Sequence, residues 1–296
     1  MTIPESPLAT LRSWAIASLA EAGVPDAAVD TDLLIGFVWK MSRGEVAAKV
    51  HSAGTLPAVD GSAAEELERA FRAMVVRRAA REPLQHILGV AWFRNLELEV
   101  GSGVFVPRPE TEMLAEHAIE SLRAAAHPEP IAVDLGTGSG AIALALATEV
   151  PHARVYAVEK SPDAAPWTRR NIARYNDCVE LVEGDLADAL SELNGTVSVI
   201  ASNPPYIPAA AVPRDPEVRL FDPEMALYGG EDGLDIVRTL SRTALRLGHP
   251  GALLILEHGE LQGADIRAIL AADGWRNPET LTDLTLRDRY TRATRP

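Results

Sequence analysis

The sequence predicts an α/β protein: a doubly wound, mostly parallel sheet preceded by a small bundle of helices. Two observations carry this prediction. From residue 131 onward, short apolar runs alternate with amphipathic helical segments, which is the pattern of a parallel sheet covered by helices. The first eighty or so residues instead show only helical periodicity. With 296 residues the chain has room for two domains.

The N-terminal part is expected to contain three helices. Ser6 and Pro7 offer a cap and a first helical position, and the first helix should end at Gly23. The second should stop at residues 42–44 after burying an apolar stripe of Val29, Leu33, Leu34, Phe37, Val38 and Met41. A capping box of Ser62 and Glu65 should open the third, which buries Leu67, Phe71, Met74 and Val75. This bundle either docks a substrate or stabilises the rest of the chain.

Residues 84–106 change to an alternating pattern and predict a β-hairpin linker. We therefore expect a helical domain over 1–82, a linker over 83–107 and a sheet domain over 108–296. Strands are predicted at 131–135, 155–158, 179–182, 197–201 and 252–257. Ligands of such sheets bind at the carboxyl ends of the strands.

A glycine-rich turn follows the first of these strands and is the expected cofactor site. Its residues are Asp134, Gly136, Thr137, Gly138, Ser139 and Gly140. The glycines let the backbone turn tightly and approach a ligand, and the free N–H groups of the next helix face it. Because a leading carboxylate disfavours a phosphate, the pattern favours S-adenosylmethionine, which carries an ammonium and a sulfonium. A nucleotide or a purely structural turn remains the alternative.

Acidic residues follow the next two strands. Glu159 ends the strand after the glycine turn, where an acid can accept both ribose hydroxyls. Asp185 and Leu186 follow the third strand and could reach the edge and the face of an adenine, or could form a solvated turn.

The segment Asn203-Pro204-Pro205-Tyr206 is the expected catalytic and substrate-binding motif. The Asn203 side-chain oxygen and the Pro204 carbonyl can each accept one N–H of a primary amide, which aims its nitrogen at a methyl donor. Two prolines stiffen the backbone, and Tyr206 can stack on a planar group. We expect Asn203 to contact the methyl donor as well.

Composition narrows the class of partner. A net charge of -14 argues against a large nucleic-acid partner. The single cysteine, Cys178, fits a reducing compartment, and neither a signal sequence nor an apolar run of membrane length is seen. His152, His249 and His258 show no ligand spacing, so no metal is expected, and His258 is interpreted as structural. We expect a cytoplasmic monomer that does not bind membranes.

These segments together resemble the HemK family, the protein-(glutamine-N5) methyltransferases that modify the Gly-Gly-Gln loop of peptide-chain release factors. The resemblance runs through residues 81–89 (REPLQHILG), 105–112 (FVPRPETE), 133–140 (VDLGTGSG), 202–207 (SNPPYI), 223–235 (PEMALYGGEDGLD) and 256–259 (LEHG). Two residues depart from the family pattern: His86, where a tyrosine is usual, and Leu286, where a glycine is common.

The resemblance implies a seven-stranded class I methyltransferase sheet with an antiparallel final strand. It also implies that residues 136–140 and Glu159 hold S-adenosylmethionine, and that residues 203–206 bind the glutamine of a class I release factor. Two further activities remain open. One is methylation of a ribosomal-protein glutamine, and the other is N-methylation of an exocyclic base amine, a reaction of enzymes that carry a similar motif. Residues 108–112 either begin a helix or form a lid.

Overall fold

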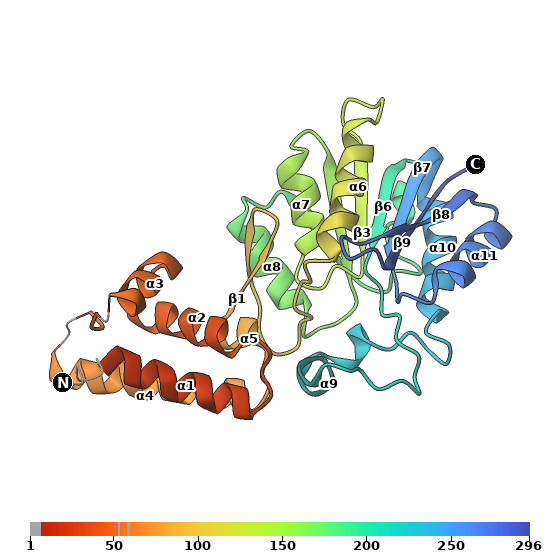
Figure 1. Ribbon diagram of the computed structural model, residues 1–296. Coiled ribbons are helices and arrows are strands. Elements are labelled where there is room, and N and C mark those ends of the chain that lie inside the picture. The colour runs from red at the N-terminus through yellow and green to blue at the C-terminus, as the bar shows by residue number, and fades with distance from the viewer. Residues whose placement is uncertain (1–6, 53, 58–59) are drawn as a thin grey trace. The chain divides into compact units, whose positions relative to one another are not determined.

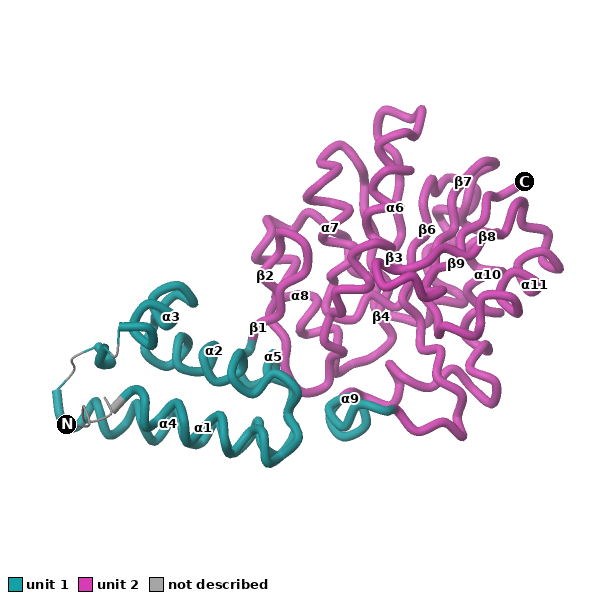
Figure 2. The backbone as a smooth tube through the Cα atoms, in the orientation of Figure 1, with its two compact units in different colours: residues 1–89, 214–221 teal, residues 90–213, 222–296 magenta. Residues whose placement is uncertain are grey.

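The computed structural model describes residues 7–52, 54–57 and 60–296. The chain divides into two compact units (Figure 2). Unit 1 comprises Met1–Gly89 and Arg214–Phe221, and unit 2 comprises Val90–Pro213 and Asp222–Pro296. The residues predicted to begin the first helix include Ser6, which lies outside the described part. Within that part, no helix is both long and apolar enough to cross a membrane.

Unit 1 is helical (Figure 1). Its helices are α1 (Pro7–Glu21), α2 (Ala27–Trp39), α3 (Arg43–His51), α4 (Gly61–Ala79), α5 (Leu84–Leu88) and α9 (Pro216–Phe221). The core is apolar, with Leu19, Leu34, Ile35 and Phe71 fully buried. Trp14 and Trp39 both pack against the Phe71 ring, at centroid distances of 6.4 and 5.6 Å. The bundle is thus held by burial of aliphatic and aromatic surface.

The predicted buried stripe of α2 is partly wrong. Val29 and Phe37 are 38% and 47% exposed, whereas Ile35 and Trp39 are buried. Nearly every residue from 33 to 39 is apolar, so periodicity alone cannot select the face. The contacts of α2 with α1 and α4 select it instead.

Two helix boundaries also differ from the prediction. Ser42 begins α3 instead of ending α2: its Oγ accepts from the Glu45 N–H at 3.3 Å, and the Glu45 carboxylate accepts from the Ser42 N–H at 2.7 Å. The cap of α4 is Asp60, whose carboxylate accepts from the Ala63 N–H at 3.0 Å, so the predicted capping box of Ser62 and Glu65 is wrong. In both places several capping residues lie within a few positions, and the sequence does not show which one is used.

The linker contains both a helix and a hairpin. Residues 84–88, predicted as extended, form α5, which ends at Gly89 with a left-handed φ of 72°. The hairpin itself is shorter, with β1 (Val90–Phe93) antiparallel to β2 (Leu96–Glu99). The alternation of Leu84, His86 and Leu88 was therefore misleading, because a single helical turn is too short to show its own period.

Unit 2 is a seven-stranded sheet in the order β5-β4-β3-β6-β7-β9-β8. Its strands are β3 (Ile131–Leu135), β4 (Arg154–Glu159), β5 (Val179–Glu183), β6 (Val197–Ser202), β7 (Gly248–Glu257), β8 (Arg276–Thr282) and β9 (Asp288–Thr294). The first five of these pair in parallel, and β9 lies antiparallel between β7 and β8. The predicted doubly wound sheet with an antiparallel final strand is confirmed.

Helices cover both faces of this sheet (Figure 1). On one face, α6 (Thr111–Arg123), α7 (Ala141–Glu149) and α8 (Ala165–Arg174) bury their apolar sides. On the other, α10 (Asp235–Leu247) and α11 (Gly263–Asp273) do the same. The order reverses at β3, which pairs with β4 on one side and β6 on the other. This is the switch point at which ligands of such sheets bind.

The segment 214–221 leaves unit 2 after β6 and belongs to unit 1 through ion pairs. Glu217 of α9 accepts from Arg78 Nη1 at 2.9 Å and from Arg81 Nη2 at 2.6 Å. Arg78 also pairs with Asp30 at 2.7 Å, and its side chain is only 8% exposed. Burial by itself raises the pKa of Glu217, but the hydrogen bonds from Arg81 and Arg78 outweigh it and lower the pKa to about 2.

Candidate active site

The predicted site residues lie where the parallel strands β3, β4, β5 and β6 end. Leu135 and Ser202 are the last residues of the adjacent strands β3 and β6, and the Ser202 hydroxyl donates to the Leu135 carbonyl at 2.5 Å. Both residues are fully buried. The hydrogen bond fixes the start of the glycine turn beside the start of the Asn203–Tyr206 motif.

The glycine turn has the backbone shape that only glycine adopts easily. Gly136, Gly138 and Gly140 have φ values of 77°, 60° and 88°. A Cβ on Gly136 or Gly138 would meet no atom within 4 Å, whereas one on Gly140 would touch Leu144 and Thr168. The first two glycines thus face open space, and the third packs at the start of α7. Thr137 and Ser139 are buried between them.

Asp134 holds this turn from inside the protein. Its side chain is fully buried, and its Oδ2 accepts from the Thr137 hydroxyl at 2.6 Å and from the Ala143 N–H at 3.1 Å. Burial raises its pKa to about 7, although both hydrogen bonds oppose the shift. Asp134 Oδ1 has no hydrogen-bond partner among the described residues. The two bonds of Oδ2 hold the glycine turn from its buried side, and the direct contact with a cationic ligand that the sequence suggested stays a prediction.

Glu159 closes the other side of the turn. It is the last residue of β4 and is 8% exposed. Its Oε2 accepts from the Gly138 N–H and its Oε1 from the Ser161 N–H, each at 2.7 Å. The carboxylate is therefore oriented by backbone groups and lies against the glycine turn, at the end of β4 where the sequence placed it.

Asp185 and Leu186 lie directly after β5. The Asp185 side chain is 44% exposed; its Oδ1 accepts from the Ala187 N–H at 3.0 Å and its Oδ2 pairs with Lys160 at 2.8 Å. These contacts lower the pKa of Asp185, with the Lys160 hydrogen bond as the main cause. Leu186 packs partly against the core.

The Asn203–Tyr206 motif is held by a second glycine-rich segment. A Cβ on Gly229 would lie 2.5 Å from the carbonyl oxygens of Pro205 and Gly233, and one on Gly233 would lie 2.3 Å from that of Tyr206. The Gly229 N–H also donates to the Ile207 carbonyl at 2.9 Å. The two backbones touch, and no side chain fits between them.

Two residues that the sequence did not predict as site residues complete the arrangement. Thr111 begins α6 and Glu257 ends β7, and they are 4% and 2% exposed. The Thr111 hydroxyl donates to Glu257 Oε2 at 2.6 Å and accepts from Asn203 Nδ2 at 3.2 Å. Burial is the main reason that the pKa of Glu257 rises to about 7. One feature of the sequence could have indicated Glu257 as a site residue: it ends a predicted strand, as Glu159 does. Helix α6 begins at Thr111, so a helix does start within residues 108–112.

His258 is structural, as expected. It is fully buried, its Nδ1 lies 2.8 Å from the Gly259 carbonyl, and its Nε2 lies 2.8 Å from the Thr291 hydroxyl. Both ring nitrogens thus have partners in the protein. Among the described residues, no group of three or more His, Cys, Asp or Glu side chains could hold a metal ion.

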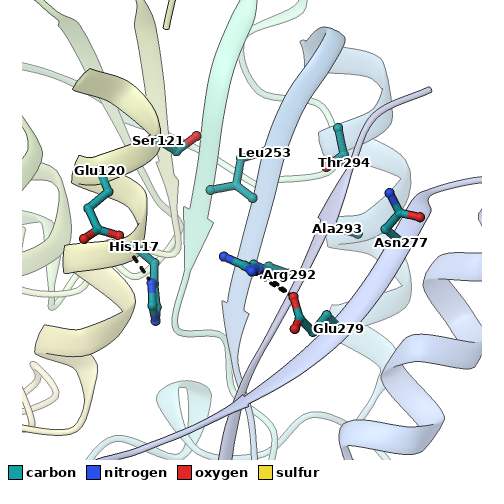
Figure 3. A pocket seen from close by; sticks show the side chains of 9 residues that line it. All are labelled: His117, Glu120, Ser121, Leu253, Asn277, Glu279, Arg292, Ala293 and Thr294. Carbon is teal, nitrogen blue, oxygen red and sulfur yellow. Dashed lines mark hydrogen bonds and ion pairs between the residues drawn. The ribbon is translucent and has the colours of Figure 1, made fainter. Parts of the chain in front are cut away.

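A hollow of about 520 Å³ lies elsewhere, between α6 and the strands β7, β9 and β8 (Figure 3). Its polar lining includes His117 and Glu120 of α6 and the Glu279–Arg292 ion pair of β8 and β9. None of the predicted site residues lines it.

The residues at the sheet edge fit S-adenosylmethionine. Two glycines face open space, a carboxylate stands at the end of β4, and an amide motif follows β6. Fold and site define an S-adenosylmethionine-dependent methyltransferase.

Comparisons identify the family. The sequence matches the PrmC N-terminal domain over residues 10–89 and the methyltransferase small domain over residues 103–222. It is 47% identical to a release factor glutamine methyltransferase of Streptomyces coelicolor, over 93% of each chain. It is 41% identical to that of Mycolicibacterium smegmatis, over 97% of this chain and 98% of the relative. The chain belongs to the release factor glutamine methyltransferase family.

Some similar proteins differ in what their names say they modify. A 4-amino-L-phenylalanine/4-methylamino-L-phenylalanine methyltransferase of Streptomyces pristinaespiralis is 40% identical over 93% of this chain and 90% of its own. A T. thermophilus 16S rRNA methyltransferase superposes with a TM-score of 0.51 at 19% identity, covering 70% of this chain and 50% of that one. The latter shares the fold alone.

Proposed function

We propose that this protein transfers the methyl group of S-adenosylmethionine to the side-chain amide nitrogen (N5) of the glutamine in the Gly-Gly-Gln motif of class I release factors. The observation that carries the proposal is the hydrogen bond that the Asn203 side-chain nitrogen donates to Thr111. Asn203 follows β6, next to the strand end where the glycine turn begins. Its oxygen is left to accept an N–H from a substrate.

The Asn203–Tyr206 motif orients the glutamine. An amide nitrogen is a weak nucleophile because its lone pair is delocalised, and S-adenosylmethionine supplies an electrophilic methyl group. Asn203 Oδ1 and the Pro204 carbonyl each accept one N–H, which fixes the nitrogen and opposes the positive charge that develops on it. Pro205 and the glycine segment hold this backbone, and Tyr206 covers the planar amide.

The donor is held by the residues around the first glycine turn. Gly136, Gly138 and the start of α7 provide close backbone approach, with Thr137, Ser139 and Gly140 completing the loop. Glu159 accepts hydrogen bonds from the ribose hydroxyls. Asp185 and Leu186 contact the adenine. Asp134 keeps the loop in shape, and Asn203 would contact the donor as well as the substrate.

The helical unit serves as the docking surface for the protein substrate, since release factors are far larger than a glutamine side chain. The protein acts in the cytoplasm as a monomer. Residues 10–89, which include most of these helices, match the N-terminal domain of the family.

A small aromatic amine is a second candidate substrate with a specific observation in its favour. The relative from Streptomyces pristinaespiralis is named for such an amine and covers nearly the whole chain. An aromatic amine is also planar and nitrogen-centred, so the motif by itself does not separate it from an amide. A ribosomal-protein glutamine and a base amine would undergo the same transfer, and the net charge of -14 disfavours the base amine.

The test is methyl incorporation from labelled S-adenosylmethionine into purified release factor, a ribosomal protein, 4-amino-L-phenylalanine and RNA. A release factor whose Gly-Gly-Gln glutamine is changed to alanine is the control. Label in the wild-type release factor and none in the control supports the proposal. Label in the aromatic amine alone would replace it with the small-molecule activity.

A further inference from the structure

Asn203 can present either its oxygen or its nitrogen to a substrate, because the two ends of a side-chain amide have nearly the same shape. Only the oxygen can accept the N–H of a substrate amide. Some feature of the protein must therefore choose between the two orientations. A residue that touches Asn203 from outside the motif can make this choice.

Thr111 makes that choice through its single hydroxyl hydrogen. The Thr111 Oγ1 lies 2.6 Å from Glu257 Oε2, and a carboxylate oxygen can only accept. The hydroxyl hydrogen is thus used on Glu257, and Oγ1 is left as an acceptor for the group at 3.2 Å, which must be Asn203 Nδ2. The reversed amide would place two acceptors against each other with no hydrogen between them.

The surroundings make the reversed orientation costly. Thr111 and Glu257 are almost completely buried, so water cannot replace a lost partner. They come from the start of α6 and the end of β7, which pack together in the core of unit 2. In the part of the chain that the structure describes, no protein group donates to Asn203 Oδ1.

We infer that Thr111 and Glu257 are positioning residues: the hydrogen-bond chain Asn203–Thr111–Glu257 fixes the Asn203 amide with its oxygen toward the substrate nitrogen. This inference rests on the proposed methylation of an amide. Thr111 and Glu257 act through the orientation of Asn203, the residue proposed to contact the substrate amide.

The first test compares Thr111→Val with Thr111→Ser in the full-length enzyme. Valine keeps the shape and removes the hydroxyl, whereas serine keeps the hydroxyl and removes a methyl group. The assays are run well above pH 7, where Glu257, with its pKa of about 7, is ionised. We expect Thr111→Val to lower kcat roughly 10- to 100-fold, with the dissociation constant of S-adenosylmethionine changed less than about threefold. Thr111→Ser should recover most of kcat.

A second measurement reads the amide itself and needs no substrate. In protein labelled with ¹⁵N at asparagine, the Asn203 side-chain NH₂ signals are assigned by their loss in Asn203→Ala. They should shift in Thr111→Val and stay near their wild-type positions in Thr111→Ser.

The outcomes separate the inference from the proposed function. Full kcat and unchanged amide signals in Thr111→Val overturn the inference, as does an equal loss in both variants with a lowered melting temperature, which would indicate packing. If wild-type enzyme methylates no amide but the NH₂ signals follow the hydroxyl, the orienting role stands and the proposed substrate fails.

Discussion

The glycine segment that supports the Asn203–Tyr206 motif offers a quantitative test of how the site is built. In Gly229→Ala the added Cβ would lie 2.5 Å from the Pro205 and Gly233 carbonyl oxygens, while ordinary contact begins at 3.4 Å. The backbones must therefore separate by about 0.9 Å. Because both obstacles are backbone atoms, no side chain can rotate away. A shift of that size next to the reacting amide should lower turnover about 100-fold, and overpacking should cost about 1–3 kcal/mol of stability.

The assay is methyl transfer under saturating S-adenosylmethionine, with donor affinity measured separately by calorimetry. Donor affinity should change little, because Gly229 contacts the substrate motif and not the first glycine turn. Gly44→Ala is the control for stability: a Cβ there meets nothing within 4 Å on the exposed helix α3, so the free energy of unfolding should not fall. Wild-type kcat in a folded Gly229→Ala protein would refute the idea that this segment sets the position of the motif.

Three further perturbations separate the roles of individual side chains. Asn203→Ala should abolish most turnover while S-adenosylmethionine binding is kept; parallel loss of both would contradict the assigned role. Glu159→Ala should mainly weaken S-adenosylmethionine binding, by roughly 1.5–3 kcal/mol in calorimetry, as expected for a lost charged hydrogen bond. An unchanged affinity would show that Glu159 does not bind the donor. Glu217 has its folded pKa lowered from 4.5 to about 2, so its ion pairs stabilise unit 1 fully above pH 4.5, and this contribution is lost as the pH falls toward 2. In denaturant unfolding, Glu217→Gln should thus be less stable than wild type at neutral pH and approach it in acid; a difference that does not shrink would exclude the ion pairs as its cause.

The sheet and the glycine turn could be predicted from the sequence because their signals are local. Each of the five parallel strands contains a short apolar run, and Gly136, Gly138 and Gly140 stand directly after one. The antiparallel strands β8 and β9 are largely polar and lack this signal. The family motifs then indicated the antiparallel final strand, which the structure confirms as β9.

Features that depend on tertiary packing could not be predicted in the same way. The buried face of α2 is chosen by its neighbours, since almost every residue from 33 to 39 is apolar. The burial of Asp134 depends on the strands on either side of β3. Thr111 and Glu257 are 146 residues apart in sequence and meet only when α6 packs against the end of β7. No periodicity in the sequence reports such a contact.

The central claim is that the anchored Asn203 amide directs methylation to one glutamine of a release factor. Tandem mass spectrometry of release factor treated with wild-type enzyme and with Asn203→Ala tests it most directly. The account predicts one added methyl group on the side chain of the Gly-Gly-Gln glutamine with wild-type enzyme, and almost none with the variant. Methylation at another residue, or equal methylation by the variant, would contradict it.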